Sequence, residues 1–382
     1  MRKRRPRSRF EGSGGAPAAA VLLFAILGVT PVLGGVNSWT ATGPAGLVYA
    51  LAADPVISGT LYASTDQGTF RSLDHGATWS SYPSTPEGLP PYAFAIDPFA
   101  RGSLVAGSNH LYRTTDDGAS WVEVTPPTYN GLITPTLLQF DTHVPGRLYA
   151  GQQGSGVFRS DDAGASWVAF DASLGLATAF AIDPADSSRL FLGTELGDVY
   201  RSLDTGATWT KVERPGFGFF LLRLAFVGAG QRALMSVSDS DMWETFNAGQ
   251  SWLPSRIPGV AALPSSLAVD PAHPANLFVT AGPPASPPEI PPPIPPAVFR
   301  STDGGVVWTP LIAGLPDYPT ITSLVADSTG TYVHGIAQTG TWSFQILGGA
   351  STTIPTLSPV LLISLAVALA IAGALAVRRA SA

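Results

Sequence analysis

Acidic side chains are the groups in this sequence best suited to chemistry, because the chain has no cysteine and its histidines lack the spacing of a metal site. A pair of carboxylates across a cleft can hydrolyse a glycosidic bond. Aspartates recur at one position, the end of a strand-like segment, at Asp54, Asp97, Asp183 and Asp270. Glutamates outside this pattern are Glu87, Glu123, Glu195, Glu213, Glu244 and Glu289. Recurrence favours a turn role for the aspartates, and no glutamate has a convincing partner. We therefore predict no catalytic residue, no metal ligand and no cofactor.

The distribution of charge bears on the possible partners. The net charge is −6, yet positive side chains gather at the two ends, in residues 1–10 and at Arg378 and Arg379. The middle of the chain is strongly acidic and holds a single lysine, Lys211. A surface that binds phosphates needs the opposite balance. The sequence therefore predicts no nucleic-acid partner.

Six segments share the pattern S/T-x-D-x-G-x-S/T-W with small variations, and we call them the repeat turns. They span residues 72–79, 114–121, 160–167, 202–209, 245–252 and 301–308. Most are spaced by about 40–50 residues, the length of one four-stranded propeller blade. Their characteristic residues are Asp74, Gly76, Trp79, Asp116, Gly118, Trp121, Asp162, Gly164, Trp167, Asp204, Gly206, Trp209, Asn247, Gly249, Trp252, Asp303, Gly305 and Trp308.

This pattern resembles the Asp-box, or BNR, repeat of the sortilin- and sialidase-like propellers. The resemblance implies that each repeat turn joins the third and fourth strands of a blade, away from the ligand face. The carboxylate can accept backbone N–H groups, the glycine can take a positive φ and the tryptophan can pack against a neighbouring blade. We therefore predict a structural role for these residues. Arginines stand three positions before the aspartate, at Arg71, Arg113, Arg159, Arg201 and Arg300. Their recurrence favours a structural ladder over the converging trio of a sialidase site.

Residues 36–350 are predicted to form an all-β, seven-bladed propeller. The seven innermost strands should end near Asp54, Asp97, Asp141, Asp183, Val227, Asp270 and Asp327. The last unit lacks a fourth strand, and Ser38-Trp39 matches the start of one. Residues 37–42 should therefore pair with residues 340–346 and close the ring, which removes exposed sheet edges.

The two ends of the chain are predicted to be targeting segments. Residues 1–35 have the basic start and apolar run of a signal peptide, with an uncleaved anchor as the alternative. Residues 359–377 are uncharged and long enough to cross a bilayer as a helix. The motif before them is Ile354, Pro355, Thr356, Leu357 and Ser358. It resembles the IPTL-CTERM tail of Gram-negative bacteria, which implies that a sorting enzyme acts on residues 351–382. A plain transmembrane anchor is the alternative.

The function that we predict from the sequence is non-catalytic. The propeller would be exported, held in the membrane or displayed on the cell surface, and would bind a protein or glycan of the bacterial envelope. The alternative is a glycoside hydrolase of the sialidase or xyloglucanase kind. Ligands are expected on the face opposite the repeat turns, because its loops vary most. These loops are residues 83–91, residues 125–134 and the proline-rich insertion 283–297.

Overall fold

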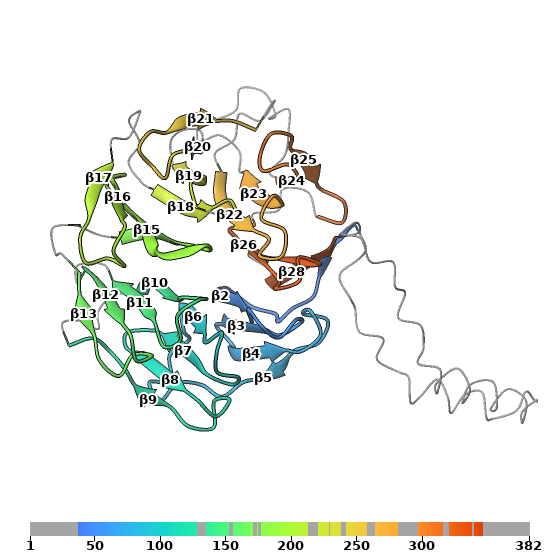
Figure 1. Ribbon diagram of the computed structural model, residues 1–382. Helices are drawn as coiled ribbons and strands as arrows, with labels where there is room; N and C mark the ends of the chain where they lie inside the picture. The colour runs from blue at the N-terminus through green and yellow to red at the C-terminus, as the bar shows by residue number, and fades with distance from the viewer. Residues whose placement is uncertain are drawn as a thin grey trace, which may run out of the picture. The chain divides into compact units, whose positions relative to one another are not determined.

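The structure, a computed structural model, is an all-β propeller of seven four-stranded sheets arranged in a ring (Figure 1). This confirms the predicted fold class and blade number. The residues that it describes are 37–127, 135–152, 156–170, 174, 177–212, 221–228, 230–237, 242–257, 264–281, 297–315, 321–337 and 340–346. The chain divides into Met1–Gln345, which contains the propeller, and Ile346–Ala382, of which only Ile346 is described.

Six blades are each built from four consecutive strands, which we label A to D from the channel outwards. Blades I to III are β2 (Val48–Ala53), β3 (Leu61–Thr65), β4 (Gly68–Ser72) and β5 (Ser80–Ser81); β6 (Ala93–Ile96), β7 (Leu104–Gly107), β8 (Leu111–Thr114) and β9 (Val122–Glu123); and β10 (Pro135–Phe140), β11 (Leu148–Gln152), β12 (Gly156–Ser160) and β13 (Val168–Ala169). Blades IV to VI are β14 (Ala177–Asp183), β15 (Asp186–Thr194), β16 (Val199–Ser202) and β17 (Thr210–Val212); β18 (Leu221–Phe226), β19 (Ala233–Val237), β20 (Met242–Thr245) and β21 (Leu253–Ser255); and β22 (Pro264–Val269), β23 (Leu277–Ala281), β24 (Ala297–Ser301) and β25 (Thr309–Leu311).

Blade VII joins the two ends of the propeller, as the sequence predicts. It contains β26 (Ser323–Ala326), β27 (Tyr332–Ala337) and β28 (Gly340–Gln345) from the end of the chain and β1 (Trp39–Ala41) from its start. Trp39 pairs with Phe344 in an antiparallel register, and their ring centroids are 5.4 Å apart. The indole nitrogen of Trp39 also donates to the carbonyl of Leu311 in blade VI, at 2.9 Å. The short closing strand is therefore fastened to two blades.

The core lies between neighbouring blades, because each sheet is covered on both sides. Most B strands are accordingly buried along their whole length, and every residue of β3, β7, β19, β23 and β27 is buried. Phe191 of β15 shows the packing between blades IV and V. Its ring centroid lies 5.1 Å from that of Phe226 and 5.7 Å from that of Trp252, the repeat-turn tryptophan of blade V. Aromatic wedges of this kind hold adjacent blades together.

Antiparallel blades place their connections on two faces of the ring. The A–B and C–D connections share one face, which we call the repeat-turn face, and the B–C and D–A connections share the other, which we call the loop face. Backbone hydrogen bonds join each repeat turn to the A–B turn of its own blade. Thr205 N–H donates to the Ser188 carbonyl at 3.0 Å, and Ala163 N–H donates to the Gly146 carbonyl at 2.7 Å.

Several predicted segments lie outside the described residues. They are the signal peptide, the sorting tail with its Ile354–Ser358 motif, residues 128–134 of one loop and residues 282–296 of the insertion. Within the described part of the chain, no helix is long and apolar enough to span a membrane.

Candidate functional site

Four repeat turns use both oxygens of their aspartate inside the turn, whereas Asp303 uses Oδ1 alone and Asn247 replaces the aspartate in blade V. Asp204 Oδ1 accepts hydrogen bonds from the Thr208 amide at 2.8 Å and from Ser202 Oγ at 2.7 Å, and Oδ2 accepts from Thr208 Oγ1 at 2.6 Å. Ser202 Oγ in turn accepts the Gly206 amide at 2.8 Å. The hydrogen bonds from Thr208 and Ser202 lower the pKa of Asp204, because they favour its ionised form. A carboxylate occupied in this way holds the turn and is not available to a substrate.

The residue that follows the acidic position of each repeat turn has a left-handed backbone. Its φ is positive at His75, Asp117, Ala163, Thr205, Ala248 and Gly304. In several turns this conformation lets the carbonyl of the positive-φ residue accept a hydrogen bond from an arginine side chain of the preceding blade. Arg159 Nη1 donates to the Thr205 carbonyl at 2.8 Å, and Arg201 Nη1 donates to the Ala248 carbonyl at 2.9 Å. These arginines therefore tie one blade to the next.

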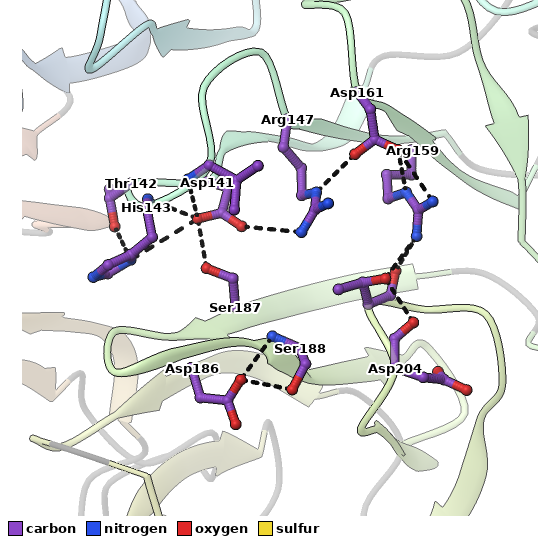
Figure 2. Close-up of polar contacts among 12 residues, drawn as sticks. Asp141, Thr142, His143, Arg147, Arg159, Asp161, Asp186, Ser187, Ser188 and Asp204 are labelled. Atoms are coloured by element: carbon purple, nitrogen blue, oxygen red, sulfur yellow. Dashed lines mark hydrogen bonds and ion pairs between the residues drawn. The ribbon is translucent and has the colours of Figure 1, made fainter.

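The aspartates at the ends of the A strands hold the A–B turns. Asp141 is fully buried, and its Oδ1 accepts hydrogen bonds from the His143 amide at 2.8 Å and from Ser187 Oγ of blade IV at 2.8 Å. Figure 2 shows how this aspartate lies beside Arg147, whose Nε donates to Asp161 at 2.7 Å. Asp54 likewise accepts the amides of two turn residues. These carboxylates are structural despite the cavity of about 590 Å³ that Asp54 helps to line at the channel.

The glutamates that break the repeat lie at separate places. Glu123 is exposed on β9, Glu195 lies in the B–C turn of blade IV, and Glu244 pairs with Arg232 in blade V. Glu213 and Glu289 lie outside the described residues. Glu87 lies in the D–A loop between blades I and II, on the loop face. The structure thus brings only this glutamate to the region described next.

Asp66 is an acidic residue that the sequence analysis did not single out. It occupies the B–C turn of blade I, on the loop face, and its side chain is exposed. Asp66 Oδ1 accepts the Leu47 amide at 3.0 Å, and the Asp66 amide donates to the Leu47 carbonyl at 3.1 Å. A Cβ on Gly46 would lie 2.3 Å from Asp66 Oδ1. The glycine therefore makes room for a carboxylate that is fixed through one oxygen, while the described residues give no hydrogen bond to the other.

Glu87 is held more tightly than Asp66. Its Oε2 accepts a hydrogen bond from Ser108 Oγ at 2.6 Å, and its Oε1 lies 3.3 Å from His110 Nδ1. Partial burial would raise the pKa of Glu87, but the hydrogen bonds from Ser108 and His110 outweigh burial and lower it. Glu87 is therefore ionised at neutral pH, with both oxygens engaged by the B–C turn of blade II.

Two tyrosines lie near these carboxylates at the start of neighbouring A strands. Tyr49 is the second residue of β2, and Tyr92 directly precedes β6. Their ring centroids are 5.3 Å apart with 59° between the ring planes. The Tyr92 amide donates to the Gly107 carbonyl at 2.7 Å, which fixes its backbone to the B strand of blade II. We call Tyr49, Asp66, Glu87, Tyr92 and His110 the blade I–II mouth.

No family model matches the chain. The chain is 33% identical over 121 residues to a xyloglucanase of Hypocrea jecorina, which covers 30% of this chain and 14% of that protein. It is 32% identical over 143 residues to a probable oligoxyloglucan-reducing end-specific xyloglucanase of Neosartorya fischeri, which covers 34% of this chain and 18% of that protein. The chain thus spans less than a fifth of the length of these curated relatives.

Solved structures share the propeller fold. The GH74 xyloglucanase of Xanthomonas campestris superimposes with a TM-score of 0.62 at 22% identity, over 80% of this chain and 53% of that chain. YCF48 bound to a D1 peptide superimposes with a TM-score of 0.62 at 14% identity, over 84% of this chain and 99% of that chain. At these identities the likeness concerns the fold alone.

These comparisons correct the predicted function. We expected a non-catalytic propeller that binds an envelope protein or glycan, and we leaned against an enzyme. The curated relatives that match in sequence are xyloglucanases, so the prediction of a non-catalytic binder is wrong. The finding favours the alternative, a glycoside hydrolase. The most conspicuous acidic residues of the sequence are the structural aspartates of the repeat turns, and a residue outside that repeat gives no comparable signal.

Proposed function

We propose that the protein is a glycoside hydrolase that cleaves a neutral glucan of the xyloglucan type. The observation that carries this proposal is the identity of 33% and 32% to two xyloglucanases. A propeller suits such a reaction, because its rigid blades hold variable loops around one face. The activity of the relatives belongs to much longer proteins, so its transfer to this chain is part of the proposal.

We place the catalytic carboxylate at Asp66. A group that exchanges a proton with a substrate must be held in place and must still leave an oxygen accessible. Asp66 meets both conditions, because the Leu47 amide fixes Oδ1 and the side chain is exposed. Glu87 and the aspartates of four repeat turns fail the second condition, since both of their oxygens are bonded, and Asp303 lies on the opposite face. Hydrolysis needs a second carboxylate about 5–10 Å away across the cleft.

The test is the release of reducing ends from xyloglucan by the full chain. Asp66→Asn should lower kcat by at least about 100-fold, the usual contribution of an acid or base, while the melting temperature stays unchanged. Glu195→Gln is the matched control, because Glu195 is also an acidic residue of a B–C turn, but in blade IV and not in blade I. Failure of the wild type to release reducing ends, or full activity of Asp66→Asn, would overturn the proposal.

We also propose the cellular placement of this enzyme. Residues 1–35 would direct export, residues 36–350 would form an Asp-box propeller, and residues 351–382 would anchor the chain in the membrane or be read by a sorting enzyme. The support is the basic and apolar pattern of the two ends and the Ile354–Ser358 motif. The glycan of the envelope or its surroundings would then be the partner. Fractionation of cells that express the full chain tests this, since recovery in the cytoplasm contradicts it.

A further inference from the structure

The ring pair of the blade I–II mouth is open to solvent on the loop face. Tyr92 is 40% exposed, and the neighbouring Leu47 and Leu89 are 50% and 40% exposed. Tyr49 is partly exposed beside Tyr92. The tilt of 59° between the rings makes a corner rather than a flat stack. Exposed rings of this kind offer an apolar face with a polar hydroxyl at one end.

The ring pair lies close to Asp66 in the fold. Asp66 is bonded in both directions to Leu47, which is only two residues before Tyr49. On the other side, Glu87 and His110 belong to the two connections that flank Tyr92. A ligand on the rings would therefore meet a fixed carboxylate at one edge and hydrogen-bonding groups at the other. This combination of apolar surface with a few polar groups is typical of small-molecule sites.

The charge around the mouth restricts the ligand. Blades I and II contain no lysine, and their arginines are Arg71, Arg101 and Arg113. All three belong to the repeat-turn side: Arg71 is bonded to Asp117, Arg101 lies in an A–B turn, and Arg113 Nη2 lies 4.0 Å from Asp97 Oδ2. Asp66 and Glu87 remain on the loop face. An anionic sugar would meet two carboxylates there without a compensating guanidinium.

We propose that Tyr92 and Tyr49 form a stacking subsite for a neutral pyranose next to Asp66, and that this site rejects acidic sugars. The subsite rests on the proposed glucanase function for the identity of the glucan, but its geometry stands on the described residues alone. The apolar face of a pyranose lies on the Tyr92 ring, and Tyr49 closes the corner behind it. Glu87 holds the His110 imidazole through Nδ1, and the other ring nitrogen of His110 is offered to a sugar hydroxyl at the rim. Tyr92 and Tyr49 are binding residues, and neither takes part in proton transfer.

Binding can be measured apart from cleavage in the Asp66→Asn protein. Calorimetric titration with a xyloglucan heptasaccharide gives its Kd, and 3′-sialyllactose serves as the anionic probe. Tyr92→Ala should weaken heptasaccharide binding by about tenfold, equivalent to about 1.4 kcal/mol. Tyr92→Phe should bind as the parent does, because it retains the ring. Tyr92→Leu repeats the test with apolar bulk but no ring. Phe99→Ala is the matched control, because Phe99 is an exposed aromatic residue (47%) in an A–B turn on the opposite face.

The outcomes separate the two proposals. Unchanged binding by folded Tyr92→Ala and Tyr92→Leu, an equal loss in Phe99→Ala, or 3′-sialyllactose binding as tight as that of the heptasaccharide overturns the subsite, whatever the hydrolytic activity. Absence of any heptasaccharide binding overturns it as well. If the wild type cleaves no xyloglucan but binds the heptasaccharide in a Tyr92-dependent way, the hydrolase proposal fails and the subsite stands. Melting curves of each variant confirm that binding is measured on folded protein.

Discussion

His75 stacks on Tyr332 across the junction of the first and last blades, with ring centroids 4.1 Å apart and 20° between the planes. Tyr332 lies 6.0 Å from a second ring, that of His334, in the same parallel arrangement. Ser343 Oγ joins the group, because it lies 2.8 Å from His334 Nδ1 and 3.4 Å from the His75 carbonyl. The ring closure therefore contains two histidines within one stack, of which His75 is partly exposed and His334 is buried.

The first prediction is that acid weakens this junction. Burial lowers the pKa of His334 from 6.5 to about 3, so the folded protein resists its protonation. The unfolded chain binds this proton below pH 6.5, and stability should fall with decreasing pH from there to about 3, by up to about 1.4 kcal/mol per pH unit. Chemical denaturation at several pH values measures this slope. His334→Asn should flatten the slope over that range, while His143→Asn, at an exposed position, should leave it unchanged. An identical slope in the wild type and His334→Asn would contradict the assignment.

The second prediction concerns blade V, where Glu244 stands in place of the repeated arginine. Arg232 bonds both Glu244 and the Gly304 carbonyl of the next repeat turn, and so makes the contact between blades that Arg201 makes one blade earlier. Arg232→Ala should cost about 3 kcal/mol in the free energy of unfolding, because it leaves the half-buried Glu244 unpaired. Adding Glu244→Ala should recover part of this loss. Denaturation of both variants and of Glu244→Ala alone gives the coupling energy, and simple additivity would rule out the pairing.

The sequence predicts the ring well because its evidence is local and repeated. The hydroxyl, acidic residue, glycine and tryptophan of each turn lie within eight positions, so the chain order alone reveals them. The same logic predicts the closing strand, since Ser38-Trp39 matches the end of a repeat turn. The sequence could not predict that Arg232 takes over the role of the arginine that the repeat lacks at Glu244. Arg232 and Glu244 are 12 residues apart and meet only in the folded blade.

The blade I–II mouth shows where this reasoning stops. Asp66 stands in Thr65-Asp66-Gln67-Gly68, a composition that any tight turn can have. An acidic residue in a B–C turn does not distinguish it either, because the B–C turn of blade IV contains Glu195 and Asp198. The contact between Tyr49 and Tyr92 joins two blades and depends on the D–A loop that contains Glu87. Only the spatial arrangement brings these residues together.

The third prediction is that Trp39 determines whether the ring closes. Its side chain is 2% exposed, packs on Phe344 and donates to the Leu311 carbonyl, whereas β1 itself has only three residues. Trp39→Ala should therefore lower the free energy of unfolding by about 3–5 kcal/mol, as expected for a buried aromatic residue. Because the backbone bonds of β1 alone are few, residues 37–42 should then exchange their amide hydrogens much faster than β27. Leu253→Ala, on the exposed outer strand of blade V, is the control and should change neither quantity. Protection of residues 37–42 that survives Trp39→Ala would show that the backbone pairing of β1 closes the ring without the indole.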